Sequence, residues 1–94
     1  MKPIHVEHMD QTTAAYIAGM IDGEGTFSDP ARLVISNCHL DMLEWIQSQL
    51  GGNIYIKRKA VGNWNTVYDY KLRRKQWDEI AHFITPYLKI KTPW

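Results

Sequence analysis

The stretch IAGMIDGEG, residues 17–25, decides the fold of this chain. Its first six residues continue a helical pattern that starts near Gln11, and glycines on both sides of Glu24 then interrupt the pattern. The sequence therefore predicts a first helix over residues 11–22, followed by a sharp change of backbone direction.

Small residues recur at every fourth position of this helix, at Ala15, Gly19 and Gly23. A stripe of this kind lets another backbone approach closely. Glycine in a helix interior costs about 1 kcal/mol relative to alanine. Because the sequence accepts this cost, it predicts a tight helix crossing, and packing on the chain's own sheet is the alternative.

Hydrophobic periodicity divides the rest of the chain into further elements. We expect short strands at residues 26–28 and 32–36 around a turn at Asp29 and Pro30, a helix at Leu40–Leu50, strands at residues 54–59 and 66–73, and a last helix at residues 76–88. The order αββαββα predicts an α+β fold, a four-stranded antiparallel sheet with helices on one face. Residues 1–10 lack periodicity and are expected to form a loose N-terminal arm, ahead of a domain of residues 11–94.

The second predicted hairpin separates apolar from basic side chains. One face is expected to hold Ile54, Ile56, Tyr68, Tyr70 and Leu72, and the other Tyr55, Lys57, Lys59, Asp69, Lys71 and Arg73. A basic sheet face can lie along phosphates and reach base edges in a groove.

Charge is distributed unevenly along the chain. Residues 1–56 hold two Lys or Arg and seven Asp or Glu, whereas residues 57–94 hold nine and three, so the net charge of +1 hides a basic C-terminal half. Such a half is compatible with a polyanionic partner or with an ordinary solvated face.

Composition excludes several classes of protein. A chain of 94 residues forms one domain, and no apolar run is long enough to cross a bilayer. Cys38 is the single cysteine, so there is no disulfide framework, and we expect it to fill the core. The N-terminus lacks the apolar core of a signal peptide. We therefore expect an intracellular protein, cytoplasmic, organellar or phage-encoded, that is neither secreted nor attached to a membrane.

Residues 17–25 resemble the motif of the LAGLIDADG homing endonucleases, with two acids and three glycines in register. Tyr16 before the motif and residues 26–28 after it also look like this family. Residues 35–37, the helix end at residues 50–52 and the segment 86–91 resemble its middle and C-terminal signatures. The resemblance covers residues 11–91 in the family's order.

The resemblance implies a mobile-element nuclease that cuts double-stranded DNA at a specific site, using Mg²⁺ or another divalent cation. Glu24 matches the metal-binding acid, Gly23 the residue whose carbonyl contacts metal, and Asp22 a structural acid. Lys91 matches a basic residue near the scissile phosphate, and Asn37 a polar residue that positions water. The end of a helix carries partial negative charge, and with Glu24 it would favour a cation that prefers oxygen ligands.

Only one motif is present, which in this family implies a homodimer. The dimer interface is expected at Ala15, Tyr16, Gly19, Met20 and Gly23. DNA contacts are expected from Arg32, Tyr55, Lys57, Lys59, Lys71, Arg73 and Lys89.

The chain departs from the family in its first hairpin, which has ten residues between Gly25 and Ser36. A short first hairpin would read fewer base pairs. Two alternatives therefore stay open: a DNA-binding module without cleavage, such as a regulator or splicing helper, and a protein-binding module such as a phage inhibitor.

Overall fold

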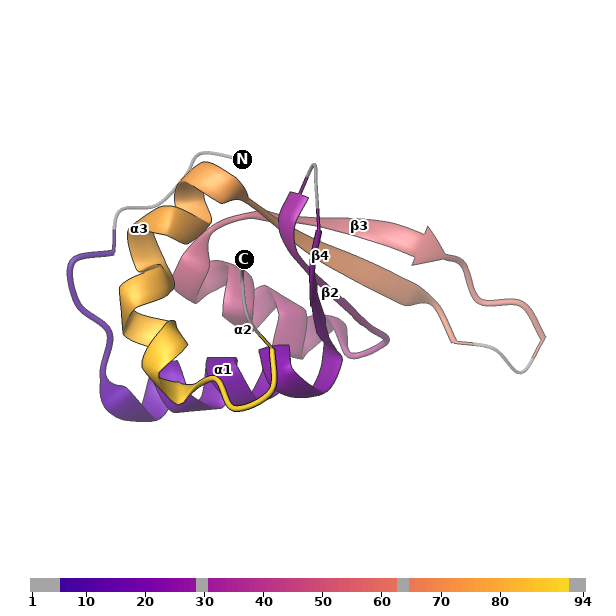
Figure 1. The fold of residues 1–94 in the computed structure, drawn as a ribbon. Helices are drawn as coiled ribbons and strands as arrows, with labels where there is room; N and C mark the ends of the chain where they lie inside the picture. The colour runs from indigo at the N-terminus through magenta and orange to yellow at the C-terminus, as the bar shows by residue number, and fades with distance from the viewer. Residues whose placement is uncertain (1–5, 29–30, 63–64, 92–94) are drawn as a thin grey trace.

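The computed structural model describes residues 6–28, 31–62 and 65–91. Helices and strands alternate as predicted (Figure 1), in an α+β fold with a four-stranded antiparallel sheet. The elements are α1 (Gln11–Glu24), β1 (Gly25–Phe27), β2 (Ala31–Asn37), α2 (Leu40–Leu50), β3 (Asn53–Arg58), β4 (Val67–Arg73), α3 (Arg74–Ile84) and the 3₁₀ turn η1 (Thr85–Tyr87). The predicted turn at Asp29 and Pro30 lies outside the described residues.

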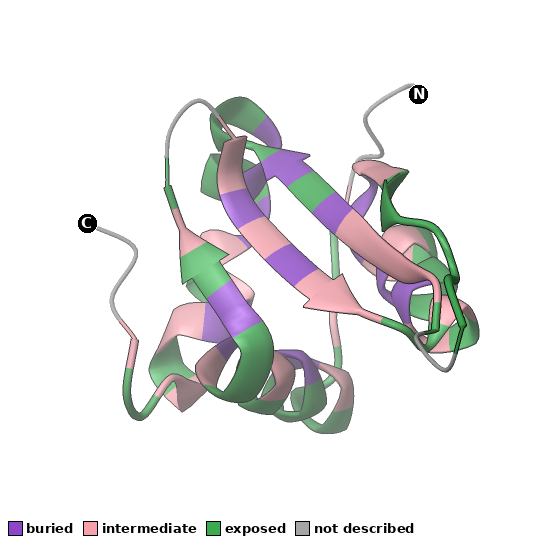
Figure 2. Ribbon diagram, turned by 90° about the vertical axis from the view of Figure 1, so that its right-hand side faces the viewer, coloured by how far each residue is buried: buried purple, intermediate pink, exposed green. Residues whose placement is uncertain are grey.

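The sheet has the strand order β1-β2-β4-β3, and the three helices pack on one of its faces. Buried residues alternate with more exposed ones along the central strands (Figure 2), as one-sided burial requires. The core joins apolar side chains of all three helices and of β2 and β4: Ile17, Ala18, Ile21, Leu33, Ile35, Leu43, Ile46, Leu50, Tyr70, Leu72, Trp77, Ile80 and Ile84. The opposite face, called here the open face, carries no helix.

Helix α1 begins at a side-chain cap and ends at a glycine. Asp10 accepts a hydrogen bond of 2.8 Å from the backbone N–H of Thr13, which lowers the pKa of Asp10. The helix continues through Gly23 to Glu24, two residues beyond the predicted end. At Gly25 the backbone becomes extended, and a Cβ atom there would lie 2.9 Å from the carbonyl oxygen of Ile21. A glycine is therefore required where α1 turns into β1.

The turn from α2 into β3 is held by a buried side chain of β4. Gly51 and Gly52 have φ angles of 80° and 91°, a region that favours glycine. The buried hydroxyl of Tyr70 donates a hydrogen bond of 2.7 Å to the carbonyl oxygen of Gly51. Burial raises the pKa of Tyr70. The end of α2 is thus tied to the middle of β4.

The last helix differs from the prediction of residues 76–88. Helix α3 starts at Arg74, directly after β4, and its α-helical part ends at Ile84. Pro86 cannot donate the next backbone hydrogen bond, and its ring crowds the carbonyl of the preceding turn. The chain therefore continues as the 3₁₀ turn η1, becomes extended at Leu88 and bends at residues 89 and 90.

The second hairpin projects beyond the helices (Figure 1), and its register places Ile54 opposite Tyr70 and Ile56 opposite Tyr68, on one face as predicted. Tyr70 and Leu72 are buried as expected, but Ile56 is 57% exposed because no helix reaches it. The described residues contain no helix long and apolar enough to cross a membrane. Before α1, Val6 and Met9 pack against the core.

Candidate active site at the end of helix α1

Glu24 is the last residue of α1 and is exposed at the edge of the sheet. The side-chain amide of Asn37, at the end of β2, donates a hydrogen bond to the Glu24 carboxylate. The side-chain oxygen Oδ1 of Asn37 accepts a hydrogen bond of 2.9 Å from the backbone N–H of His39. Asn37 therefore holds Glu24 and the start of α2 together, and the structure brings two predicted site residues into contact.

An open hollow lies beside this pair. It is lined by Glu24, Asn37, Cys38, His39, Arg58, Asn65 and Val67. The hollow thus combines a carboxylate, two amides, an imidazole, a thiol and a guanidinium, groups that can bind a phosphate ester or orient water. Its walls come from α1, β2 and the two strands of the projecting hairpin.

Asp22 fastens the C-terminal tail to the same end of α1. Its carboxylate oxygens accept hydrogen bonds from the backbone N–H groups of Lys89 at 2.7 Å, Ile90 at 3.1 Å and Lys91 at 3.0 Å. The bond from Lys91, and then that from Lys89, holds the pKa of Asp22 below its usual value of 3.8. Asp22 therefore shapes the site by holding backbone.

The clamp on the tail also places the side chain of Lys91. Its Nζ donates a hydrogen bond of 3.2 Å to the carbonyl oxygen of Ile21, in the last turn of α1. A cation at this position complements the partial negative charge of the helix end. Lys91 and Glu24 are thus both attached to the last turn of α1.

The described residues of one chain offer few ligands for a divalent cation at this helix end. Among the described residues, no three His, Cys, Asp or Glu side chains are grouped as a metal site would need. Glu24 contributes one carboxylate, and the helix end contributes backbone carbonyls such as that of Gly23. These oxygens have the right chemistry for Mg²⁺, which prefers oxygen ligands.

Ala15, Gly19 and Gly23 lie on a side of α1 that is exposed in the described part of the chain. Tyr16 is also exposed, and a Cβ atom at Gly19 or Gly23 would meet no atom within 4 Å. The helix packs on its own sheet through Ala14, Ile17, Ala18 and Ile21. The alternative reading of the small-residue stripe, as packing on the chain's own sheet, is therefore wrong.

The remaining members of the predicted interface lie at the border of this exposed side. Met20 is half-buried and packs against the core. Tyr16 is 52% exposed, and its ring makes an edge contact with that of Trp45 on α2, with ring centroids 5.3 Å apart. Sequence patterns did not indicate Trp45, because its neighbour in space belongs to another helix.

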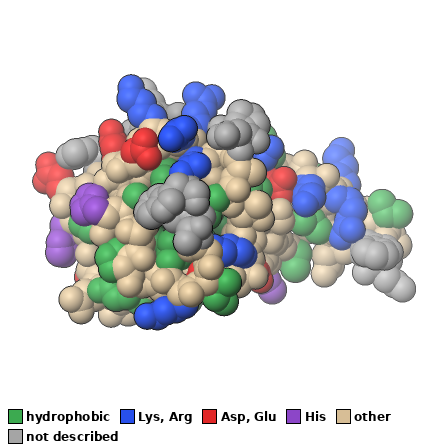
Figure 3. Space-filling view, in the orientation of Figure 1, with side chains coloured by type: hydrophobic (Ala, Val, Ile, Leu, Met, Phe, Trp, Pro, Cys, Tyr) green, Lys and Arg blue, Asp and Glu red, His purple; other side chains and the backbone are tan. Residues whose placement is uncertain are grey.

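The predicted DNA-contacting residues do not form one group. Tyr55, Lys57, Lys59, Lys71 and Arg73 are exposed on the β3–β4 hairpin, where Lys and Arg side chains gather (Figure 3). The Nζ atom of Lys71 lies 5.5 Å from the centre of the Tyr55 ring. Lys89 belongs to the clamped tail. Arg32 is only partly exposed, and its Nε is buried without a partner among the described residues.

Three further side chains of the hollow were not expected from the sequence: His39, Arg58 and Asn65. The register shifts between Ile56 and Arg58, and this irregularity breaks the alternation on which the faces were predicted. Cys38 is exposed and lines the hollow, so its expected role in the core is wrong.

In comparisons with known proteins, the chain matches no family model and no curated protein. Fold and site together define an α+β domain with an uncovered sheet face and a carboxylate at the exposed end of its first helix.

Proposed function

We propose that this chain is one subunit of a homodimeric, metal-dependent DNA endonuclease of the LAGLIDADG type. The observation that carries the proposal is the end of α1. There Glu24, held by Asn37, stands beside a helix face on which the described residues leave Gly19 and Gly23 uncovered. Each chain offers half of a site, and a second copy would complete it.

The exposed side of α1 supports the dimer. Exposed glycines allow two helices to approach closely, and their position on one helix face allows a symmetric contact. Two α1 helices side by side would bring two Glu24 carboxylates together. This arrangement explains why the described residues of one chain lack a complete metal site.

In such a dimer, Glu24 and the carbonyl of Gly23 would hold the metal ions. A divalent cation bound there would lower the pKa of water and stabilise the leaving oxygen of a phosphodiester. Asn37 orients the Glu24 carboxylate through its amide. Lys91, held near the helix end by the Asp22 clamp, would provide a cation for the scissile phosphate.

The open face supports a role in DNA binding. Its exposed basic and aromatic side chains on β3 and β4 suit contacts with phosphates and base edges. The hairpin that carries them projects on the side of the Glu24 hollow, since Arg58 and Val67 line that hollow. A duplex lying on this face would pass the helix end.

A DNA-binding module without cleavage is the second candidate. It is favoured by the short first hairpin, in which β1 has three residues and offers little surface for reading bases. A protein-binding module is the third candidate, and weak DNA binding at physiological salt would favour it over both others.

Incubation with a library of randomised duplexes in Mg²⁺, followed by sequencing of the cut ends, tests the proposal. We expect double-strand cuts at a nearly palindromic site, and none when a chelator replaces Mg²⁺. DNA binding without any cut would favour the second candidate. Absence of binding would exclude both DNA functions.

A further inference from the structure

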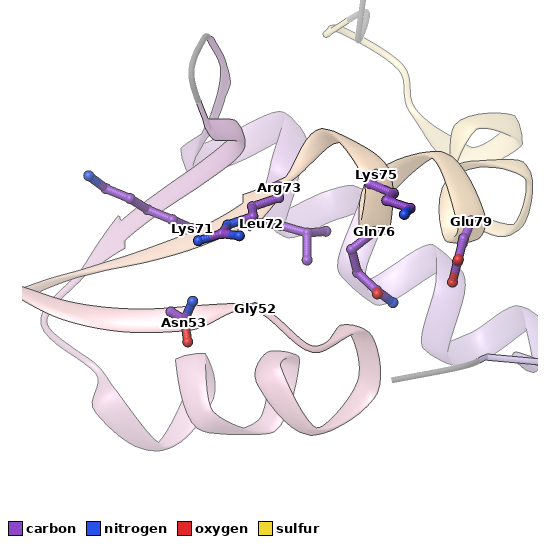
Figure 4. A pocket seen from close by; sticks show the side chains of 8 residues that line it. All are labelled: Gly52, Asn53, Lys71, Leu72, Arg73, Lys75, Gln76 and Glu79. Atoms are coloured by element: carbon purple, nitrogen blue, oxygen red, sulfur yellow. The ribbon is translucent and has the colours of Figure 1, made fainter. Parts of the chain in front are cut away.

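A second basic group lies at the junction of β4 and α3, away from the Glu24 hollow. Lys71, Arg73, Arg74 and Lys75 line one hollow there together with Ala31, Asn53 and Tyr55, and no carboxylate is among the described residues that line it. Lys71 and Arg73 extend from β4 and Lys75 from the first turn of α3 (Figure 4). Four cationic residues in consecutive or alternate positions therefore line one hollow.

Among the described residues, no acid forms an ion pair with these cations. Within the described part of the chain, Arg73, Arg74 and Lys75 have no ion pair or hydrogen bond through their side chains, and Lys71 contacts only the Tyr55 ring. Glu79 lies one helical turn after Lys75 and lines a second hollow that Lys71, Arg73 and Lys75 also line (Figure 4), but it forms no ion pair with them. An anion bound among these exposed cations would reduce their mutual repulsion.

The cluster continues the open face. Arg73 pairs with Ala31 of β2, and Lys71 pairs with Asn53 of β3, so the hollow joins the edge of the sheet to the start of α3. The first turn of α3 adds partial positive charge of the same sign. An anion in the hollow could therefore belong to a ligand that also lies on the sheet.

The cluster is too far from Glu24 to act on the same phosphate. Val67 and Arg73 are the two ends of β4, and Val67 lines the Glu24 hollow. Six residues of extended strand span about 20 Å. Along one strand of DNA this corresponds to about six nucleotides.

We propose that Arg74 and Lys75, with Arg73 and Lys71, bind neighbouring backbone phosphates of duplex DNA outside the cleaved segment. This inference rests on the proposed DNA-binding function. This phosphate contact would not distinguish base sequences. It would hold the duplex on the sheet, whose short first hairpin offers few contacts of its own. Arg74 and Lys75 thus become part of the DNA-binding surface, although they lie on a helix.

The test is the salt dependence of binding to a duplex of mixed sequence. In the double variant Arg74→Gln/Lys75→Gln, we expect weaker binding at every salt concentration, and a slope of log K against log salt that is smaller by about 2, since each phosphate contact contributes about 0.9. Arg74→Lys/Lys75→Arg should keep the slope. Ser48→Asp/Gln49→Glu changes net charge equally, on the helical side of the sheet, and should also keep it.

The outcomes separate this inference from the proposed function. If the wild-type protein binds DNA and the double variant keeps the full slope, the phosphate site is overturned, and the proposed nuclease stands. If the wild-type protein binds no duplex at any salt concentration, the proposed function fails, and the phosphate site fails with it. Circular dichroism of each variant establishes that the fold is retained.

Discussion

The carboxylate of Asp22 accepts a hydrogen bond of 3.0 Å from the backbone N–H of Lys91, which is 69 positions later in the chain. The same carboxylate binds the N–H groups of Lys89 and Ile90. One side chain thereby determines where the tail runs and where the Lys91 ammonium group lies. Because Asp22 is used in this contact, Glu24 is the acid of residues 17–25 that remains for the proposed chemistry.

Asp22→Asn should release the tail. An asparagine side chain has one acceptor oxygen where the carboxylate has two, and its NH₂ group would face backbone donors. We expect faster amide hydrogen exchange at residues 89–91, measured by NMR. Asp10→Asn, which alters the cap at the other end of α1, should leave these amides unchanged. Equal exchange in Asp22→Asn and the wild-type protein would contradict the clamp.

Acid should open the same clamp. The pKa of Asp22 is lowered in the folded state, so its contribution to folding is complete above its usual value of 3.8 and is lost as pH falls through the lower folded-state value. The amide resonances of Lys89 and Lys91 should therefore shift in this acidic range. A midpoint at or above 3.8 would show that these N–H groups do not stabilise the carboxylate.

Gly19→Ala should separate the stability of the chain from its association. A methyl group there meets no atom of the same chain, and alanine favours a helix over glycine by about 1 kcal/mol. We expect a more stable monomer in urea unfolding at low concentration, but a weaker dimer in sedimentation equilibrium. Glu44→Ala, on exposed α2 surface, should leave association unchanged. A variant dimer as tight as the wild-type dimer would exclude this face as the interface.

Tyr70→Phe should destabilise the fold by about 1–3 kcal/mol, because it leaves the carbonyl of buried Gly51 without its hydrogen bond. Urea unfolding gives the change in free energy. Tyr55→Phe is the matched control, since the Tyr55 side chain is 50% exposed and should cost little. A similar small change in both variants would mean that the bond from Tyr70 contributes little.

The sequence predicted the elements well because their signals are local. The order of helices and strands, the α2 bounds and the core positions of β4 follow from hydrophobic periodicity. The sequence predicts the end of α1 two residues too early, because Gly23 and Gly25 both resemble helix breakers. In the structure, α1 continues through Gly23, and of these two glycines only Gly25 leaves no room for a Cβ atom. The exposure of Ile56 depends on how far the helices extend, which periodicity does not encode.

The site was predictable only in part. Residues 17–25 indicated Glu24, and the structure adds the contact with Asn37, which depends on how β2 returns to the end of α1. The clamp of Asp22 on the tail and the position of His39 depend on contacts between distant segments. No pattern within one segment reports such contacts.

The most direct test of the central claim is cleavage by Glu24→Gln in Mg²⁺, on the duplex that the wild-type protein cuts. The amide keeps the shape of the carboxylate but removes its charge, so we expect DNA binding to persist and cleavage to be lost. Glu44→Gln, on α2, should cut as the wild-type protein does. Cleavage by Glu24→Gln at the wild-type rate would contradict a metal-dependent nuclease site at the end of α1.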